Sequence, residues 1–107
     1  MTTDVMNKGR IKALKSLGTE ACEEIFNEFL LLYNQKLTEL DEFIELEDQE
    51  NIQKITHLLK GTFLNIGADK SAKIVSNIRF QNEQNKKLYN DLKETTEASI
   101  NMFHSSQ

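Results

Sequence analysis

The 107 residues of this chain include no proline and only four glycines. Proline and glycine are the residues that most often interrupt a helix, because they cost about 3 and 1 kcal/mol of helix stability relative to alanine. A chain with so few of them favours long helices, and its apolar residues recur at helical spacing. We therefore predict an all-α fold: an antiparallel up-and-down four-helix bundle with a short additional N-terminal helix.

The first part of the sequence predicts two helices. The first spans about residues 5–17, where apolar residues share one side. Gly18 is expected to end this helix and Thr19 to serve as the N-cap of the second, which continues to the acidic stretch 45–50. The expected core-facing residues of these two helices are Ile11, Leu14, Leu17, Ile25, Phe26, Phe29, Tyr33, Leu37, Leu40 and Ile44.

The remaining sequence predicts three more helices. Asp48 is placed to cap the third helix, and Gly67 is expected to end or bend it. A fourth apolar face follows, and the polar residues 81–85 are expected to form a turn before the last helix. The expected core-facing residues of these helices are Ile52, Ile55, Leu59, Ile66, Ala68, Ala72, Val75, Ile78, Leu88, Leu92, Thr95, Ser99 and Met102.

Length and composition predict a single domain over residues 1–107, with 38% apolar and 28% charged residues, as is ordinary for a soluble protein. No apolar run approaches the length of a membrane span, and Met1–Asp4 lacks the start of a secretion signal, so we expect a cytoplasmic protein without a membrane partner. Cys22 has no second cysteine to pair with and is expected to be buried. The net charge of −4 argues against nucleic-acid binding, and a bundle that covers its own apolar faces is expected to be a monomer.

One histidine stands out because of the helical positions around it. In the third predicted helix the expected buried residues lie about 140 to 160° around the axis from His57, so this side chain is expected to face water. A neutral exposed imidazole is a competent nucleophile toward a phosphoryl group, and the transferred group brings about two negative charges. Five further residues lie within about 60° of His57 on the same face. They are Gln53, Lys54, Lys60, Gly61 and Leu64.

Each of these five neighbours has an expected role. Lys60, one turn away, offsets part of the phosphate charge by about 1 kcal/mol, which is too little to drive catalysis alone. Gly61 costs about 1 kcal/mol of helix stability relative to alanine. A glycine at this position is explained if a bulky partner must approach His57 closely. Leu64 on an exposed face is expected to dock against that partner, as are Gln53 and Lys54, although Lys54 is equally well interpreted as a solvated charge.

The run from His57 to Thr62 reads His-Leu-Leu-Lys-Gly-Thr, and Gly67-Ala68 follows it. This pattern resembles the core motif of the histidine-containing phosphotransfer (HPt) domain, which reads roughly His-x-Leu-Lys-Gly-Ser/Thr and ends in Gly-Ala. Asp48 and Ile52 also stand where that family often has an aspartate and a hydrophobic residue. The resemblance extends over about residues 8–103.

Three residues depart from the family's pattern. Thr56 stands where alanine is common, Ser71 where leucine is usual, and Arg79 where glutamate is frequent. These departures bear on packing and on the choice of partner. None of them changes the histidine, lysine or glycine of the motif.

The resemblance implies a phosphorelay intermediate in two-component signal transduction. His57 would accept a phosphoryl group from the aspartate of a receiver domain of a hybrid sensor histidine kinase, and would pass it to the receiver domain of a response regulator. In that family the receiver supplies the acidic pocket and its Mg²⁺, so no cofactor and no metal of its own is expected here. The chain would be a phosphocarrier rather than a self-sufficient enzyme.

Other functions find less support in the sequence. There is no Gly-x-x-x-x-Gly-Lys loop and no Gly-x-Gly-x-x-Gly turn to bind ATP, so the phosphoryl group must come from outside. Neither histidine belongs to a Glu-x-x-His pair of the kind that builds metal sites in bundles. One alternative stays open: a non-transferring helical binding module, either a degenerate HPt domain or an adaptor, that regulates a signalling partner by docking. This alternative predicts that biological activity persists after His57→Gln.

Overall fold

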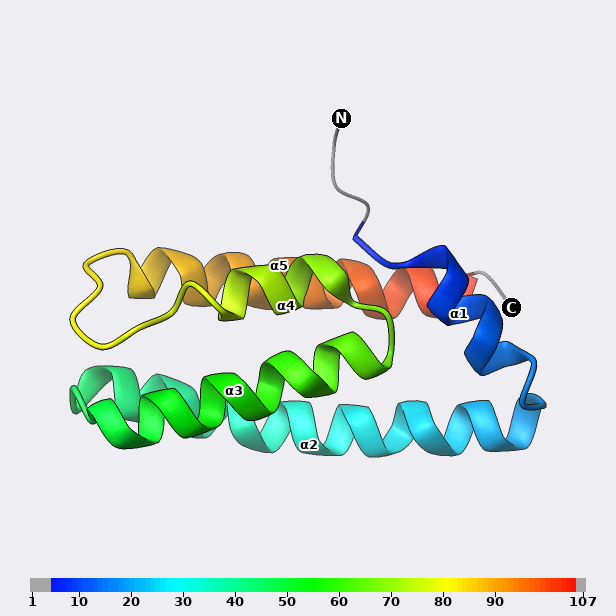
Figure 1. Cartoon of the computed structure of the whole chain (residues 1–107), viewed down its shortest axis with the longest axis horizontal. Coiled ribbons are helices and arrows are strands. Elements are labelled where there is room, and N and C mark those ends of the chain that lie inside the picture. Colours follow the sequence, from blue (N-terminus) through cyan, green and yellow to red (C-terminus); the bar gives the residue numbers. More distant parts are fainter. Residues whose placement is uncertain (1–4, 106–107) are drawn as a thin grey trace.

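The computed structural model describes residues 5–105, and in that part it contains five α-helices and no strand. The helices are α1 (Lys8–Lys15), α2 (Thr19–Glu45), α3 (Gln49–Asn65), α4 (Asp69–Val75) and α5 (Asn85–Ser105). Figure 1 shows α3 returning alongside α2, and α4 lying alongside α5, with α1 near one end of the molecule. The predicted all-α class is confirmed.

None of the helices in residues 5–105 combines the length and the apolar character needed to cross a membrane. The expectation about a secretion signal rests on Met1–Asp4, which lie outside the described residues.

The junction between α1 and α2 differs from the prediction in two ways. Helix α1 ends at Lys15 with Ser16 as its C-cap, so Leu17 lies beyond the helical register and is 58% exposed rather than buried. The predicted N-cap was also wrong, because Gly18 occupies that position with φ +101° and Thr19 is the first helical residue. The φ of this cap favours a residue without a Cβ.

Aromatic side chains hold the long helices together. Phe26 of α2 stacks on Phe103 of α5 with ring centroids 4.0 Å apart. Phe63 of α3 lies 6.0 Å from Phe29 and 5.8 Å from Tyr33, both on α2. Such ring pairs add about 0.5–1.5 kcal/mol each beyond the area they bury. One aromatic cluster therefore links α2, α3 and α5.

The buried face of α5 corrects the prediction for that helix. Its buried apolar and hydroxyl residues fall four, three and four positions apart, whereas Met102 is 40% exposed and Thr95 is only half-buried. Helical geometry brings Phe103, one residue later than Met102, onto the core side. The buried residues of α5 are Asn85, Leu92, Thr96, Ser99 and Phe103.

A buried pair of hydroxyls links α4 to α5. Ser71 of α4 and Thr96 of α5 are both fully buried, and their oxygens are 2.9 Å apart in a hydrogen bond. Burial raises the pKa of the neighbouring Tyr33 phenol from 10.0 to about 12, while a hydrogen bond with Thr96 acts in the opposite direction. A leucine at position 71 would therefore remove one of the hydrogen bonds of the buried Thr96 hydroxyl.

The turn between α3 and α4 requires glycine. Gly67 has φ +82°, and a Cβ on it would lie 3.0 Å from the Cβ of Arg10. The close approach allows the backbone N–H of Asn7 to donate to the Gly67 carbonyl (2.6 Å) and the Arg10 Nε to donate to the Asn65 carbonyl (2.7 Å). The start of α1 thus contacts the carbonyl end of α3, where a cation is favoured by the helix dipole.

Candidate functional site

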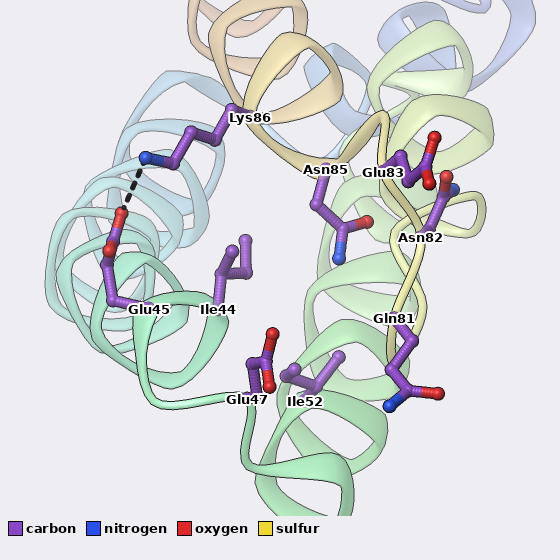
Figure 2. A pocket seen from close by; sticks show the side chains of 9 residues that line it. All are labelled: Ile44, Glu45, Glu47, Ile52, Gln81, Asn82, Glu83, Asn85 and Lys86. Carbon is purple, nitrogen blue, oxygen red and sulfur yellow. Dashed lines mark ion pairs between the residues drawn. The ribbon is translucent and has the colours of Figure 1, made fainter.

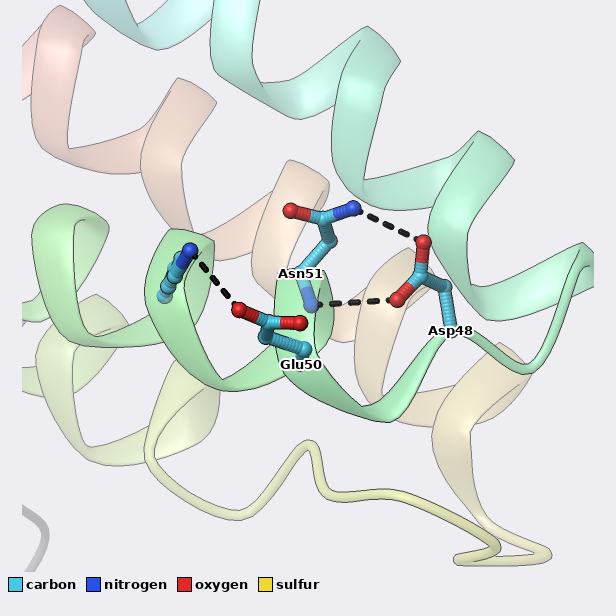
Figure 3. Close-up of polar contacts among 4 residues, drawn as sticks. Asp48, Glu50 and Asn51 are labelled. Atoms are coloured by element: carbon cyan, nitrogen blue, oxygen red, sulfur yellow. Dashed lines mark hydrogen bonds and ion pairs between the residues drawn. The ribbon is translucent and has the colours of Figure 1, made fainter.

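The helix that carries His57 begins at a side-chain cap, as predicted. The Asp48 carboxylate accepts hydrogen bonds from the Asn51 backbone N–H (3.2 Å) and from its side-chain amide (2.7 Å), as Figure 3 shows. The first of these contacts satisfies a backbone donor that a helix start otherwise leaves unpaired. The Asp48 cap therefore determines where α3 begins.

The rotation of α3 about its axis is fixed by its apolar residues. Ile52, Ile55 and Leu59 are 2%, 5% and 0% exposed, and Phe63 and Ile66 are buried as well. Burial of this side leaves the opposite side of the helix in solvent. The predicted core positions of α3 are all confirmed.

His57 lies on the outward side of α3 and is exposed. The structure brings the five other predicted site residues to exposed positions on the same helix, so these six residues define the His57 face. They are Gln53, Lys54, His57, Lys60, Gly61 and Leu64. Their assigned roles stay predictions, because exposure gives access to a partner without identifying one.

The sequence interpretation missed Leu58, which borders the His57 face and is 42% exposed. Leu64, on the other side of His57, is 46% exposed. Leu58 lies about 100° around the helix from His57, between the exposed residues within about 60° and the buried residues beyond about 140°. Its angle alone therefore does not predict whether it is buried or exposed. Two accessible leucines therefore flank the histidine.

The two lysines of the His57 face differ in their surroundings. Lys54 forms an ion pair with Glu50 at 3.0 Å, with both side chains at least 70% exposed. A pair as exposed as this one contributes little to stability, yet it supplies Lys54 with a counter-ion. Lys60 has no carboxylate partner among residues 5–105. It is the lysine of this face that is available to an incoming anion.

Gly61 has open space around it. A Cβ built on this residue meets no atom within 4 Å apart from its chain neighbours and the nearby backbone of α3 itself, in contrast to the crowded position of Gly67. Its place within α3 requires no left-handed backbone conformation. Neither the packing nor the backbone of the described residues explains a glycine here.

A hollow of about 460 Å³ lies away from His57, where the α2–α3 turn faces the α4–α5 loop. Figure 2 shows its acidic and amide side chains, with Glu45 paired to Lys86 at 3.1 Å. Asn85 is the first residue of α5. Its side-chain oxygen accepts a hydrogen bond from the Arg79 backbone N–H, and its side-chain nitrogen donates one to the Arg79 carbonyl, so both polar atoms of the side chain have partners. In residues 5–105 no group of three or more His, Cys, Asp or Glu side chains is placed to hold a metal ion.

Cys22 and His104 both contribute to packing away from α3. Cys22 is buried, as predicted, with 5% of its surface exposed. His104 is exposed, and its ring packs edge-on against Phe26 at 5.2 Å. Neither residue lies on α3, so neither belongs to the His57 face.

Comparison of the chain with protein-family models, with curated proteins and with solved structures gave no match. The functional interpretation therefore rests on the residues and geometry described above.

Proposed function

We propose that this protein is a histidine phosphocarrier of the HPt type, acting as a monomer in the cytoplasm. In this proposal α2 to α5 correspond to the antiparallel up-and-down four-helix bundle of that class, and α1 is the additional N-terminal helix. The chain would receive a phosphoryl group from a receiver domain of a hybrid sensor kinase and deliver it to the receiver of a response regulator.

One observation carries the proposal: an exposed histidine stands one turn from a helical glycine that no internal contact explains. Gly61 costs α3 about 1 kcal/mol relative to alanine, and a Cβ there would have free space. The space above Gly61 is adjacent to His57 on the helix surface. A partner backbone or side chain that must reach the imidazole closely accounts for the missing side chain.

The chemistry needs one nucleophile from this chain. The lone-pair nitrogen of the neutral His57 imidazole attacks the phosphorus of an aspartyl phosphate on the partner, and the other ring nitrogen keeps its proton. The N–P bond forms as the bond from phosphorus to the aspartate oxygen breaks, and the aspartate leaves as a carboxylate. Transfer to the next receiver reverses these bond changes, with Mg²⁺ expected on the receiver.

The neighbours of His57 would supply positioning. Lys60 has no competing carboxylate among the described residues and offsets part of the phosphoryl charge, by about 1 kcal/mol for an exposed pair. Leu58 and Leu64, both more than 40% exposed, would contact the apolar part of the partner. These contributions orient the reactants while the receiver supplies most of the catalysis.

The proposal is tested by phosphoryl transfer from a radiolabelled phosphorylated receiver domain. We expect His57→Gln to abolish acceptance of the label without unfolding the chain, because the side chain is exposed. Gly61→Glu is expected to slow transfer strongly by bulk and charge. Ala98→Glu, which places the same carboxylate on the exposed face of α5, is the matched control and is expected to transfer normally.

Two outcomes would count against the proposal. Equal transfer rates in the parent, His57→Gln and Gly61→Glu would exclude His57 as the acceptor. Binding of receivers without any transfer of label would favour the non-transferring binding module instead.

A further inference from the structure

The short helix α4 leaves one side of α3 uncovered. Helix α3 has 17 residues and α4 has seven, and the chain between α4 and α5 is irregular. Because α4 starts at the C-terminal end of α3, it ends before reaching the N-terminal half of that helix (Figure 1). The α4–α5 loop lies beside this half of α3 and leaves a groove of about 430 Å³ between them.

The groove has an apolar floor, a polar rim and one charge. Its walls come from α3 and from the segment after α4: Gln49, Ile52, Gln53, Thr56, Ser76, Ile78, Arg79 and Phe80. Ile52 and Ile78 are buried, whereas Phe80 is 37% exposed. Arg79 is exposed, and it forms no ion pair with any residue of the described part of the chain.

Hydrogen bonds to a buried side chain hold the backbone of Arg79 in place. The buried Asn85 accepts a hydrogen bond from the Arg79 backbone N–H (3.2 Å) and donates one to its carbonyl (2.7 Å). These bonds hold the backbone of the loop at the point where the guanidinium leaves it. The cation is therefore presented from a fixed loop, which reduces the entropy lost when it binds.

The groove is continuous with the His57 face. Gln53 belongs to both, since it lines the groove and lies about 40° around α3 from His57. The surrounding sequence has an excess of cations: residues 49–80, which include every residue that lines the groove, contain five cations and two acids, Asp69 and Glu50, the latter paired with Lys54, whereas α2 is strongly acidic. The five cations are Lys54, Lys60, Lys70, Lys73 and Arg79. A partner that meets this side of the molecule is favoured if its own surface is acidic.

We infer that the groove receives an acidic surface segment of the protein that docks on His57, and that Arg79 is a specificity residue for this partner. A carboxylate of the segment pairs with the Arg79 guanidinium, and an apolar side chain next to it packs against Phe80 above Ile52 and Ile78. The inference rests on the proposed function, since the segment belongs to the same receiver that exchanges the phosphoryl group. It assigns to Arg79 the selection of the partner and not the chemistry.

The experiment measures transfer rates against receiver concentration for a panel of radiolabelled phosphorylated receiver domains, with binding measured separately by biolayer interferometry. The variants are Arg79→Glu, Arg79→Gln and Phe80→Ser. Lys93→Glu is the charge-matched control, because Lys93 lies on α5 over the ring of Tyr89, whose hydroxyl bonds α2. Thermal unfolding of each variant verifies that the fold is kept.

For the receiver that the parent uses best, we expect Arg79→Glu to raise KM and Kd by about tenfold at unchanged kcat, with a smaller rise for Arg79→Gln. Phe80→Ser is expected to weaken binding as well, and Lys93→Glu is expected to match the parent. Raised salt should reduce the difference between Arg79→Glu and the parent, because exposed charges are screened.

Four results would overturn the inference. Transfer by Arg79→Glu at the parental KM would leave the phosphocarrier function intact and exclude the groove. An equal loss in Lys93→Glu would show a general charge effect, and concentration-dependent self-association lost in Arg79→Glu would show that the occupant is a second copy of this chain. Absence of both binding and transfer in the parent would overturn the proposed function together with the inference.

Discussion

Replacement of Gly61 by alanine separates a glycine required by the fold from one required by a partner. Apart from its chain neighbours and the nearby backbone of α3, no atom lies within 4 Å of the added Cβ, and the residue has an ordinary helical conformation within α3. Alanine in a helix interior is more favourable than glycine by about 0.5–1 kcal/mol, so Gly61→Ala is expected to stabilise the protein by that amount. For a domain of this size the gain corresponds to a rise in Tm of about 2–4 °C.

Gly67→Ala is the matched control for this prediction. Gly67 has φ +82°, and a Cβ would lie 3.0 Å from the Arg10 Cβ and 3.2 Å from the Asn7 carbonyl oxygen. We expect this change to destabilise the protein by about 1–3 kcal/mol, because both the conformation and the contact are unfavourable. Urea and thermal denaturation of both variants provide the measurement. A loss of stability in Gly61→Ala would show that the fold needs this glycine, and would remove the main argument for a partner at this position.

Three further predictions concern the core and the cap of α3. Ser71→Ala is expected to lower the free energy of unfolding by about 1–3 kcal/mol, and adding Thr96→Val should recover part of the loss. If the effects of the two substitutions on the free energy of unfolding in urea were strictly additive, the buried hydrogen bond between these residues would be contradicted. Asp48→Ala is expected to cost about 1 kcal/mol through loss of the N-cap, and unchanged stability in the same assay would exclude that role. The pKa of Tyr33 is raised from 10.0 to about 12, so its contribution to stability is constant below pH 10 and is lost as the pH rises toward 12, where the unfolded state ionises first. Tyr33→Phe should reduce the alkaline decline, with a part remaining because burial also raises the pKa of Tyr89, and an identical pH profile in the variant would refute the assignment.

The core of α3 was predictable because its signals are local. The spacing of Ile52, Ile55 and Leu59 defines one side of a helix, and Asp48 lies at the position of an N-cap. The same spacing predicts that His57 lies on the opposite side of the helix. Amphipathic pattern therefore determines which residues of a long helix face solvent, and the candidate site follows from it.

The ends of the helices were less predictable because they depend on competing local bonds and on contacts distant in sequence. Helix α4 ends at Val75, where the Ser76 hydroxyl and the Asn77 amide both donate to the Lys73 carbonyl in place of a continuing helix. The groove beside His57 is a consequence of this early end. No periodicity in the sequence indicates it.

Two residues show how the register of a pattern limits prediction. Leu17 continues the spacing of the first helix but lies beyond its end, and Met102 neighbours the buried Phe103 on α5. Spacing alone predicts a core-facing position for both Leu17 and Met102. The burial of Leu17 depends on where the first helix ends. The burial of Phe103 in place of Met102 depends on contact with Phe26, which is made only in the folded protein.

The most direct measurement is the chemical identity and position of the group acquired from a phosphorylated receiver domain. After incubation, the purified chain is digested and the modified peptide is located by mass spectrometry, while a radiolabelled sample is treated with acid and with base. The proposal predicts one phosphoryl group on the peptide that contains His57, labile in acid and stable in base, and none in His57→Gln. A label on another residue, or one that survives acid, would contradict it.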